Sequence, residues 1–266
     1  MTVQQHLAKA SQLGLWETIG AEAQQLGAKE PLLRQLLQSL IIERPSLPEA
    51  LAAILVRDLR IAEMDETAFH DILAEALSDP AIAATLVRDL QAVRDRDPAC
   101  TTYLHALLHY KGFRALQAHK VAHRLWTEQR SELASWISGR VSLTLGPDIH
   151  PGARIGGGIM LDHGAGVVIG ETAVVEDDVS ILQNVTLGGS GKILGDRHPK
   201  VRRGVMIGAG AKVIGNIEIG AFSKIAAGSV VLKDVPARCT VAGVPAQVVR
   251  IHGSVEAPAA SMDQHI

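Results

Sequence analysis

The chain has 266 residues, of which 47% are hydrophobic but only 3% aromatic, so it can form one or two domains with an aliphatic core. With 26 basic against 28 acidic residues it lacks the positive charge of a nucleic-acid-binding protein, and its two cysteines are too few for a disulfide framework. No segment reaches the roughly 20 apolar residues that span a bilayer, so we expect no membrane partner and a cytoplasmic location.

Residues 1–140 predict an α-helical domain. Leucines recur at helical spacing from Leu32 to Leu40, and Ser46 with Glu49 has the spacing of a capping box. Asp79-Pro80 and Asp97-Pro98 each predict an acidic N-cap followed by proline. A further helical pattern runs from residue 101 to 138, with a break expected near Gly112. Leucine covers several helical faces, which predicts an oligomerisation domain.

Residues 141–250 predict a parallel β-helix. Over 139–146 the aliphatic residues alternate, which predicts a strand-like transition. From there an aliphatic residue recurs at every sixth position: Ile149, Ile155, Leu161, Ile169, Val175, Ile181, Leu187, Val201, Ile207, Val213, Ile219, Ile225 and Val231. A period of six fits neither a single strand nor a helix and indicates short strands stacked coil upon coil. A turn-rich closure is expected after Val231, and 251–266 are predicted to be a flexible C-terminal tail.

The six-residue register breaks twice. Eight residues separate Leu161 from Ile169, and fourteen separate Leu187 from Val201. Insertions in a stacked-coil protein become surface loops, often on its binding face. We therefore expect Asp162-His163 in the first break, and the glycines and Arg197-His198 in the second, to lie on the outside of the coil.

The chain closely resembles the bacterial serine O-acetyltransferases. The resemblance is carried by these motifs in this order: Asp148-Ile149-His150-Pro151, Leu161-Asp162-His163, Gly170-Glu171-Thr172-Ala173, Val185-Thr186-Leu187-Gly188-Gly189 and Gly195-Asp196-Arg197-His198-Pro199-Lys200. It implies an α+β chain in two parts, a helical domain followed by a left-handed β-helix. It also implies transfer of the acetyl group of acetyl-CoA to the hydroxyl of L-serine, which gives O-acetyl-L-serine and CoA in cysteine biosynthesis. Acetyl-CoA is the co-substrate, and no metal or permanently bound cofactor is expected.

The resemblance also implies roles for particular residues. His163 would be the general base, since the pKa of histidine is near neutrality, and Asp148 would orient it. Arg197 would bind the serine carboxylate through its planar fork, while Asp97 and Asp162 would bind the ammonium group. His198 would hold the substrate and assist the base, and Glu171 would lie near the substrate. Coenzyme A would bind to backbone donors at Gly188, Gly189 and Ser190. Its pantetheine arm would lie beside the small residues Ala209 and Ala227.

Several of these residues have simpler explanations. Helix capping alone would account for Asp97, and Glu171 could be merely solvated. His105 with His109, and His119 with His123, have the spacing of zinc ligands on a helix, but packing explains them better. Alternative functions are acetyl transfer to another small hydroxyl acceptor, a γ-type metal lyase with His150, His163 and His198 as zinc ligands, or a scaffold without catalysis.

The resemblance finally implies partners. We expect a homohexamer built as a dimer of trimers, and L-cysteine as a feedback inhibitor. The C-terminal Ile266 is expected to dock into O-acetylserine sulfhydrylase, because the family's C-terminal peptide also ends in isoleucine.

Overall fold

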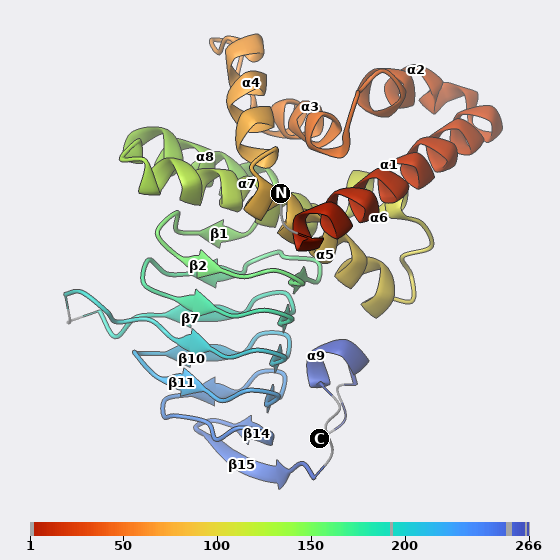
Figure 1. Ribbon diagram of the computed structural model, residues 1–266. Helices are drawn as coiled ribbons and strands as arrows, with labels where there is room; N and C mark the ends of the chain where they lie inside the picture. The colour runs from red at the N-terminus through yellow and green to blue at the C-terminus, as the bar shows by residue number, and fades with distance from the viewer. Residues whose placement is uncertain (1–2, 192–193, 254–256, 264, 266) are drawn as a thin grey trace.

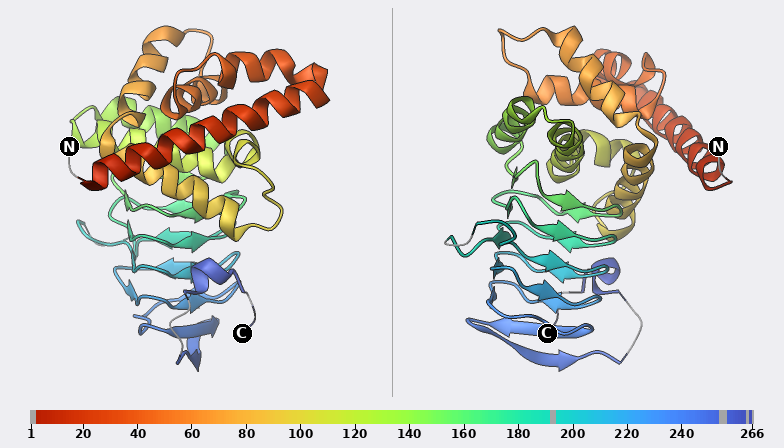
Figure 2. Two further views of the ribbon diagram at one scale, coloured as in Figure 1. Left: turned by 45° about the vertical axis from the view of Figure 1, so that its right-hand side comes forward. Right: turned by 60° about the vertical axis from the view of Figure 1, so that its left-hand side comes forward.

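The computed structural model describes residues 3–191, 194–253, 257–263 and 265. A helical half sits on one end of a column of coils (Figure 1), and the same two layers are seen from other sides in Figure 2. The helical half comprises α1 (Val3–Lys29), η1 (Pro31–Leu33), α2 (Arg34–Leu37), η2 (Gln38–Ile42), α3 (Leu47–Leu59), α4 (Glu66–Leu77), α5 (Pro80–Arg96), α6 (Tyr103–His109), α7 (Lys111–Thr127) and α8 (Ser131–Thr144). Among the described residues, no helix is long and apolar enough to cross a membrane.

Polar side chains cap several helices. Ser46 accepts a hydrogen bond from the Glu49 amide at 3.5 Å, as predicted, and Asp79 caps the start of α5. The prediction that Asp97 starts a helix is wrong. Asp97 follows the last residue of α5, and the Thr102 side chain caps α6 instead. Capping therefore does not account for Asp97.

Two other predictions about the helical half are corrected. The long pattern over 101–138 forms three helices: the break expected near Gly112 lies at Tyr110, and a second break, which was not predicted, lies at 128–130. The strand-like transition over 139–146 is wrong, since α8 continues to Thr144. Val141 and Leu145 are buried because residues four apart share one face of a helix.

The coil half confirms the parallel β-helix, here left-handed. Its strands are β1 (Asp148–Ile149), β2 (Arg154–Ile155), β3 (Met160–Leu161), β4 (Val168–Ile169), β5 (Val174–Val175), β6 (Ser180–Ile181), β7 (Thr186–Gly188), β8 (Lys200–Val201), β9 (Met206–Ile207), β10 (Lys212–Ile214), β11 (Glu218–Ile219), β12 (Lys224–Ile225) and β13 (Val230–Val231). They form three sheets in the orders β1-β4-β7-β10-β13, β2-β5-β8-β11 and β3-β6-β9-β12, with parallel pairing throughout.

Strand pairing shows where the two register breaks fall. Val168 pairs with Thr186, eighteen residues later, so a regular coil contains three hexads. Asp148 pairs with Val168 over twenty residues and Thr186 with Lys212 over twenty-six, because the two insertions lie in those coils. All the hexad aliphatic residues point inward, and all but the half-buried Ile155 are buried.

Two edges of this three-sided column matter for function. The turns 162–167, 182–185, 208–211 and 226–229 lead from the β3-β6-β9-β12 sheet to the β1-β4-β7-β10-β13 sheet, and we call them the base edge. The turns 150–153, 170–173, 189–199 and 215–217 lead from that second sheet to the β2-β5-β8-β11 sheet, and we call them the loop edge. The long turn of the loop edge projects from the column in Figure 1.

The coil closes with strands where only turns were expected. β14 (Cys239–Gly243) pairs with β12 in parallel, and β15 (Ala246–Ile251) adds an antiparallel partner. Within the predicted tail, the short helix α9 (Pro258–Ser261) lies beside the coil on the side away from the projecting loop (Figure 1). Ala259 is fully buried there, and its carbonyl accepts a hydrogen bond from the Ser180 hydroxyl at 2.9 Å.

The two halves share a packed seam. Leu116 of α7 belongs to the coil's core, and Met160 of β3 belongs to the helical core. Asp89 of α5 is completely buried, pairs with Lys120 of α7, and accepts a hydrogen bond from the Ile159 amide at 2.9 Å. The helical half therefore holds the first coil directly where β3 begins.

Candidate active site

The base edge presents His163 in the turn after β3. Its backbone is left-handed, with φ of 57°, and its side chain is 71% exposed. The ring Nε2 lies 3.7 Å from Oδ1 of Asp162, which is only 19% exposed. Burial raises the pKa of Asp162, the charge of His163 lowers it, and the charge of Asp97 raises it again. An imidazole open to solvent beside a carboxylate can accept a proton from an incoming hydroxyl.

Asp97 comes to this site from the helical half. Its Oδ1 accepts a hydrogen bond from the Ala99 amide at 2.8 Å, and its Oδ2 accepts one from the Tyr110 hydroxyl at 2.5 Å. The negative charge of Asp97 helps raise the pKa of Asp162, so the two predicted ammonium-binding carboxylates lie near enough to interact electrostatically. Sequence reasoning identified both acids but missed Tyr110, for which no motif or spacing gave a signal.

The structure does not join Asp148 to His163. Asp148 is exposed at the start of β1, and the adjacent Pro147 packs close to Gly164, so both residues belong to the same end of the column. No hydrogen bond or ion pair links their two side chains, both of which the structure describes. The carboxylate that contacts His163 is that of Asp162.

The loop edge holds a second group of residues, centred on Thr172. The Thr172 hydroxyl oxygen accepts hydrogen bonds from the amides of Arg197 and His198 at 3.0 and 3.1 Å. The Thr172 amide donates to Nδ1 of His198 at 3.2 Å. Since an amide can only donate, Nδ1 carries no proton, and the neutral ring presents an N–H at Nε2. Burial lowers the pKa of His198, with a further contribution from the Arg197 charge, so the arrangement makes His198 a hydrogen-bond donor.

Glycines make room for this histidine. A Cβ on Gly170 would lie 2.0 Å from Nε2 of His198, and one on Gly189 would lie 3.1 Å from the same atom. Gly170 and Thr172 stand within a motif that carried the family resemblance, yet sequence reasoning assigned neither a role. Their functions depend on contact with residues 25 or more positions away.

Arg197 and Glu171 form an ion pair on the loop edge. Nη2 of Arg197 donates to Oε2 of Glu171 at 2.7 Å, and Nη1 donates to the Gly195 carbonyl at 3.0 Å. This hydrogen bond lowers the pKa of Glu171. Glu171 thus contacts the predicted carboxylate-binding arginine and can orient its guanidinium.

The predicted coenzyme A residues divide between the two edges. Gly188 ends β7, and Gly189 and Ser190 begin the long turn of the loop edge. Ala209 and Ala227 instead lie on adjacent coils of the base edge, where the Gly228 amide donates to the Ala209 carbonyl at 2.8 Å. One chain alone does not bring the two sets together. The zinc-ligand alternative is divided in the same way, with His163 on the base edge and His150 and His198 on the loop edge. Among the described residues, no three metal-binding side chains converge.

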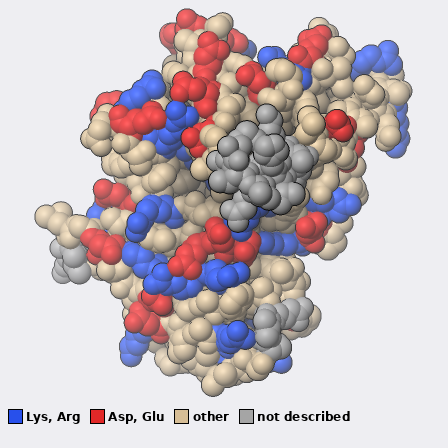
Figure 3. Space-filling model, in the orientation of Figure 1, with Lys and Arg blue, Asp and Glu red and all other residues tan. Residues whose placement is uncertain are grey.

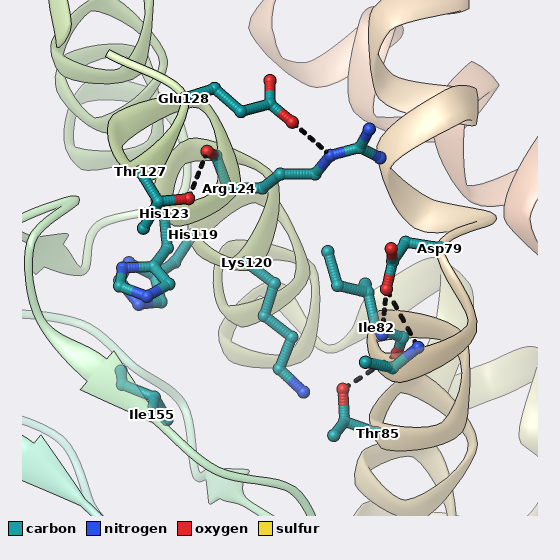
Figure 4. A pocket seen from close by; sticks show the side chains of 11 residues that line it. Asp79, Ile82, Thr85, His119, Lys120, His123, Arg124, Thr127, Glu128 and Ile155 are labelled. Atoms are coloured by element: carbon teal, nitrogen blue, oxygen red, sulfur yellow. Dashed lines mark hydrogen bonds and ion pairs between the residues drawn. The ribbon is translucent and has the colours of Figure 1, made fainter. Parts of the chain in front are cut away.

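A cleft of about 530 Å³ lies at the seam between α5, α7 and β2, and neither His163 nor Thr172 lines it. Figure 4 shows the side chains that line it, among them His119, His123 and Lys120 of α7 and Ile155 of β2. Burial lowers the pKa of His119 to about 3, so this ring is neutral in the folded protein. On the face of the coil shown in Figure 3, acidic and basic side chains lie interspersed without forming a broad patch of one sign.

Comparison with known proteins first defines the class. Residues 198–233 match the bacterial transferase hexapeptide model of six repeats, and residues 15–118 match the N-terminal domain of serine acetyltransferases. The chain is thus a hexapeptide-repeat acyltransferase with a helical N-terminal half.

Full-length relatives define the family. The serine acetyltransferase of Salmonella typhimurium is 51% identical over 252 residues, which cover 94% of this chain and 92% of that protein. The Vibrio cholerae serine acetyltransferase structure has a TM-score of 0.93 at 50% identity and covers 96% of this chain and 98% of its own. A serine acetyltransferase in complex with cysteine has a TM-score of 0.93 at 47% identity, covering 96% of this chain and 99% of its own. The chain therefore belongs to the serine acetyltransferase family.

Proposed function

We propose that this chain transfers the acetyl group of acetyl-CoA to the L-serine hydroxyl in cysteine biosynthesis, using residues from both edges of the coil. One observation carries the proposal. His163 stands exposed beside Asp162, and the pKa of Asp162 is raised in part by the charge of Asp97, a carboxylate that helix capping leaves unexplained. The assay is CoA release from acetyl-CoA with L-serine as acceptor. Equal rates with small hydroxyl acceptors that lack an amino-acid group would contradict this acceptor assignment and favour the alternative one.

His163 acts as the general base. As the serine oxygen bonds to the thioester carbonyl carbon, an imidazole nitrogen takes the hydroxyl proton. The tetrahedral intermediate then breaks its carbon–sulfur bond, and the imidazolium returns the proton to the sulfur of CoA. Direct transfer fits the position of Cys239, which is buried with its thiol directed to the Ala237 carbonyl and is therefore poorly placed as a nucleophile.

Two carboxylates compete for the role of orienting His163. Asp148 is the family expectation, and Asp162 is the observed contact at 3.7 Å. The exposed ring can rotate towards either one when substrate binds. Comparing kcat for Asp148→Asn and Asp162→Asn decides, because the orienting carboxylate should affect kcat, whereas an ammonium ligand should affect mainly the KM for serine.

Substrate binding uses both groups of residues. Asp97 and Asp162 bind the serine ammonium, while Arg197, oriented by Glu171, binds the carboxylate. His198 donates a hydrogen bond from Nε2 to the substrate, since the Thr172 amide already occupies Nδ1. This revises the expected assistance to the base.

Acetyl-CoA binds along the base edge. Ala209 and Ala227, two small side chains on adjacent coils, leave space for the pantetheine arm. The backbone of Gly188, Gly189 and Ser190 contacts the cofactor from the other side. Solved relatives hold coenzyme A in the enzyme of Brucella abortus strain S19 and serine in the soybean enzyme.

The complete site forms between neighbouring chains. Each chain has the base-edge group on one edge of its column and the loop-edge group on another, so a ring of three chains would pair unlike edges. Helical halves would then join two trimers into a hexamer. Mixing inactive His163→Ala with inactive Arg197→Ala and allowing the subunits to exchange should restore about a quarter of the sites if the two residues come from different chains. No recovery after confirmed exchange would place both residues in one chain.

L-Cysteine presents the same ammonium and carboxylate as serine. It should therefore occupy the site of Asp97, Asp162 and Arg197 and inhibit competitively with serine. Inhibition that does not change with serine concentration would exclude a shared site.

The C-terminal segment docks into O-acetylserine sulfhydrylase through Ile266, which lies outside the described residues. Here the Lys224 ammonium donates to the carbonyls of Asp263, at 2.9 Å, and His265, so docking requires these bonds to break. Lys224→Met should therefore strengthen binding to the sulfhydrylase. The peptide 261–266 should also bind more tightly than the same peptide lacking Ile266, and equal binding of the two peptides would exclude this role.

A further inference from the structure

The Asp97 carboxylate is fixed from inside the helical half. It follows α5, and each of its oxygens accepts one hydrogen bond, Oδ1 from the Ala99 amide and Oδ2 from the Tyr110 hydroxyl. An ionised carboxylate has about four lone-pair positions, so both oxygens can still accept bonds from a ligand. The Ala99 bond is local to the turn. The Tyr110 bond reaches across thirteen residues and sets the direction of the carboxylate.

Tyr110 is itself held in place. It occupies the junction between α6 and α7, is half-buried against the helical core, and has its ring edge-on to His105 with 5.7 Å between centroids. Burial and the hydrogen bond to Asp97 raise the pKa of Tyr110 above its ordinary value. The hydroxyl therefore keeps its proton, and remains a donor, across the working pH range of an enzyme.

The same junction also holds Asp162. Gly112, two residues after Tyr110, packs so closely on β3 that a Cβ there would lie 2.1 Å from the Leu161 carbonyl oxygen. Leu161 immediately precedes Asp162. A segment of three residues, 110–112, thus touches Asp97 at one end and the strand leading to Asp162 at the other, and so sets the spacing of the two carboxylates.

We propose that Tyr110 is a positioning residue that fixes the Asp97 carboxylate, opposite Asp162, to receive the ammonium group of the amino-acid substrate. The inference rests on the proposed function and deepens it. Two carboxylates held close together repel one another unless a cation lies between them. Fixing them in advance therefore selects a substrate with a positive amino group and lowers the cost of ordering the site on binding.

The test is Tyr110→Phe, which removes one oxygen and keeps the ring. A hydrogen bond to a charged group is worth enough that its loss should raise the KM for serine about tenfold or more. The KM for acetyl-CoA and kcat should change by less than about twofold, because the base and the thioester site are untouched. The matched control is Tyr103→Phe. It removes the other tyrosine hydroxyl, which is also half-buried in this core and makes no hydrogen bond in the described structure.

Two further variants separate the possible failures. If Asp97→Asn leaves the KM for serine unchanged, the proposed ammonium site itself is wrong. If Asp97→Asn raises that KM while Tyr110→Phe behaves like Tyr103→Phe, only the positioning role is wrong. The double variant Asp97→Asn with Tyr110→Phe should bind serine no worse than Asp97→Asn alone, because both changes remove one interaction. Additive losses, or a Tyr110→Phe loss shared equally by both substrates, would show a general structural effect and overturn the inference.

Discussion

In the coil, the core residues come at fixed intervals along the chain, whereas in the helical half they come from helices separated by turns of varied length. Each coil repeats the inward positions of the one before it, as the pairing of Ile169 with Leu187 and of Leu187 with Val213 shows. The helical core instead packs α1 against α5 and α3 against α8, with no repeating interval. In the coil, strand register determines which residues are buried, whereas in the helical half side-chain packing determines it.

The difference explains how the site is divided. Turns at the column's edges carry His163, Arg197 and His198, and their heights are set by strand pairing. The helical half supplies Asp97 and holds the coil at Asp89 and Gly112. The repetitive coil places side chains at regular positions along its column, and the non-repetitive helical half adds one carboxylate beside a single coil.

Removing the base tests the coil's part of the site and should have the largest effect. His163→Ala should lower kcat by about two to four orders of magnitude, because a positioned general base contributes that much. The side chain is exposed, so the melting temperature should stay near that of the parent protein. Turnover near the parent rate in a folded variant would show that another group takes the proton.

A methyl group at the seam tests the helical half's hold on the coil. Gly112→Ala would place its Cβ 2.1 Å from the Leu161 carbonyl oxygen, and we expect a loss of about 3 kcal/mol in unfolding free energy together with lower kcat. Denaturant unfolding and steady-state kinetics measure both. The control is Gly139→Ala in α8, where an added Cβ would meet no other part of the structure within 4 Å, and the free energy of unfolding should rise by about 0.5–1 kcal/mol. Equal changes in unfolding free energy and kcat for the two variants would show that the contact at Gly112 does not hold the coil in place.

The loop edge can be tested through its arginine. Arg197→Lys should raise the KM for serine by about tenfold, far more than the KM for acetyl-CoA, because an ammonium cannot reproduce the two-pronged contact of a guanidinium with a carboxylate. The comparison needs both Michaelis constants. Equal increases for the two substrates would place Arg197 away from the serine carboxylate.

The last test concerns the acid response of the seam, which lies outside the proposed site. His119 has a folded-state pKa of about 3 against an ordinary 6.5, so below pH 6.5 the unfolded chain binds a proton that the folded chain does not. Its contribution to stability is therefore complete above pH 6.5 and is lost as pH falls from 6.5 towards 3, at up to about 1.4 kcal/mol per pH unit. His119→Gln should show a shallower loss of stability between pH 6.5 and 5. An unchanged slope would show that His119 is not buried in the neutral form.

Sequence alone determined the coil and predicted which of its turns carry the candidate site residues. A period of six leaves no choice of strand, turn or inward face. Its two breaks located Asp162-His163 and Arg197-His198 in turns between the strands, where His163 is exposed but His198 is buried. The capping-box spacing likewise placed the start of α3 at Ser46, because a cap depends only on residues a few positions apart.

Only the tertiary structure decided the rest, since these features depend on contacts between distant residues. Whether Asp97 caps a helix depended on where α5 ends, and its partner Tyr110 could not be found by spacing. The tautomer of His198 depended on Thr172, twenty-six residues earlier. Local patterns can specify a repeat or a cap, but the direction of a carboxylate or an imidazole is set by whichever side chain the fold brings beside it.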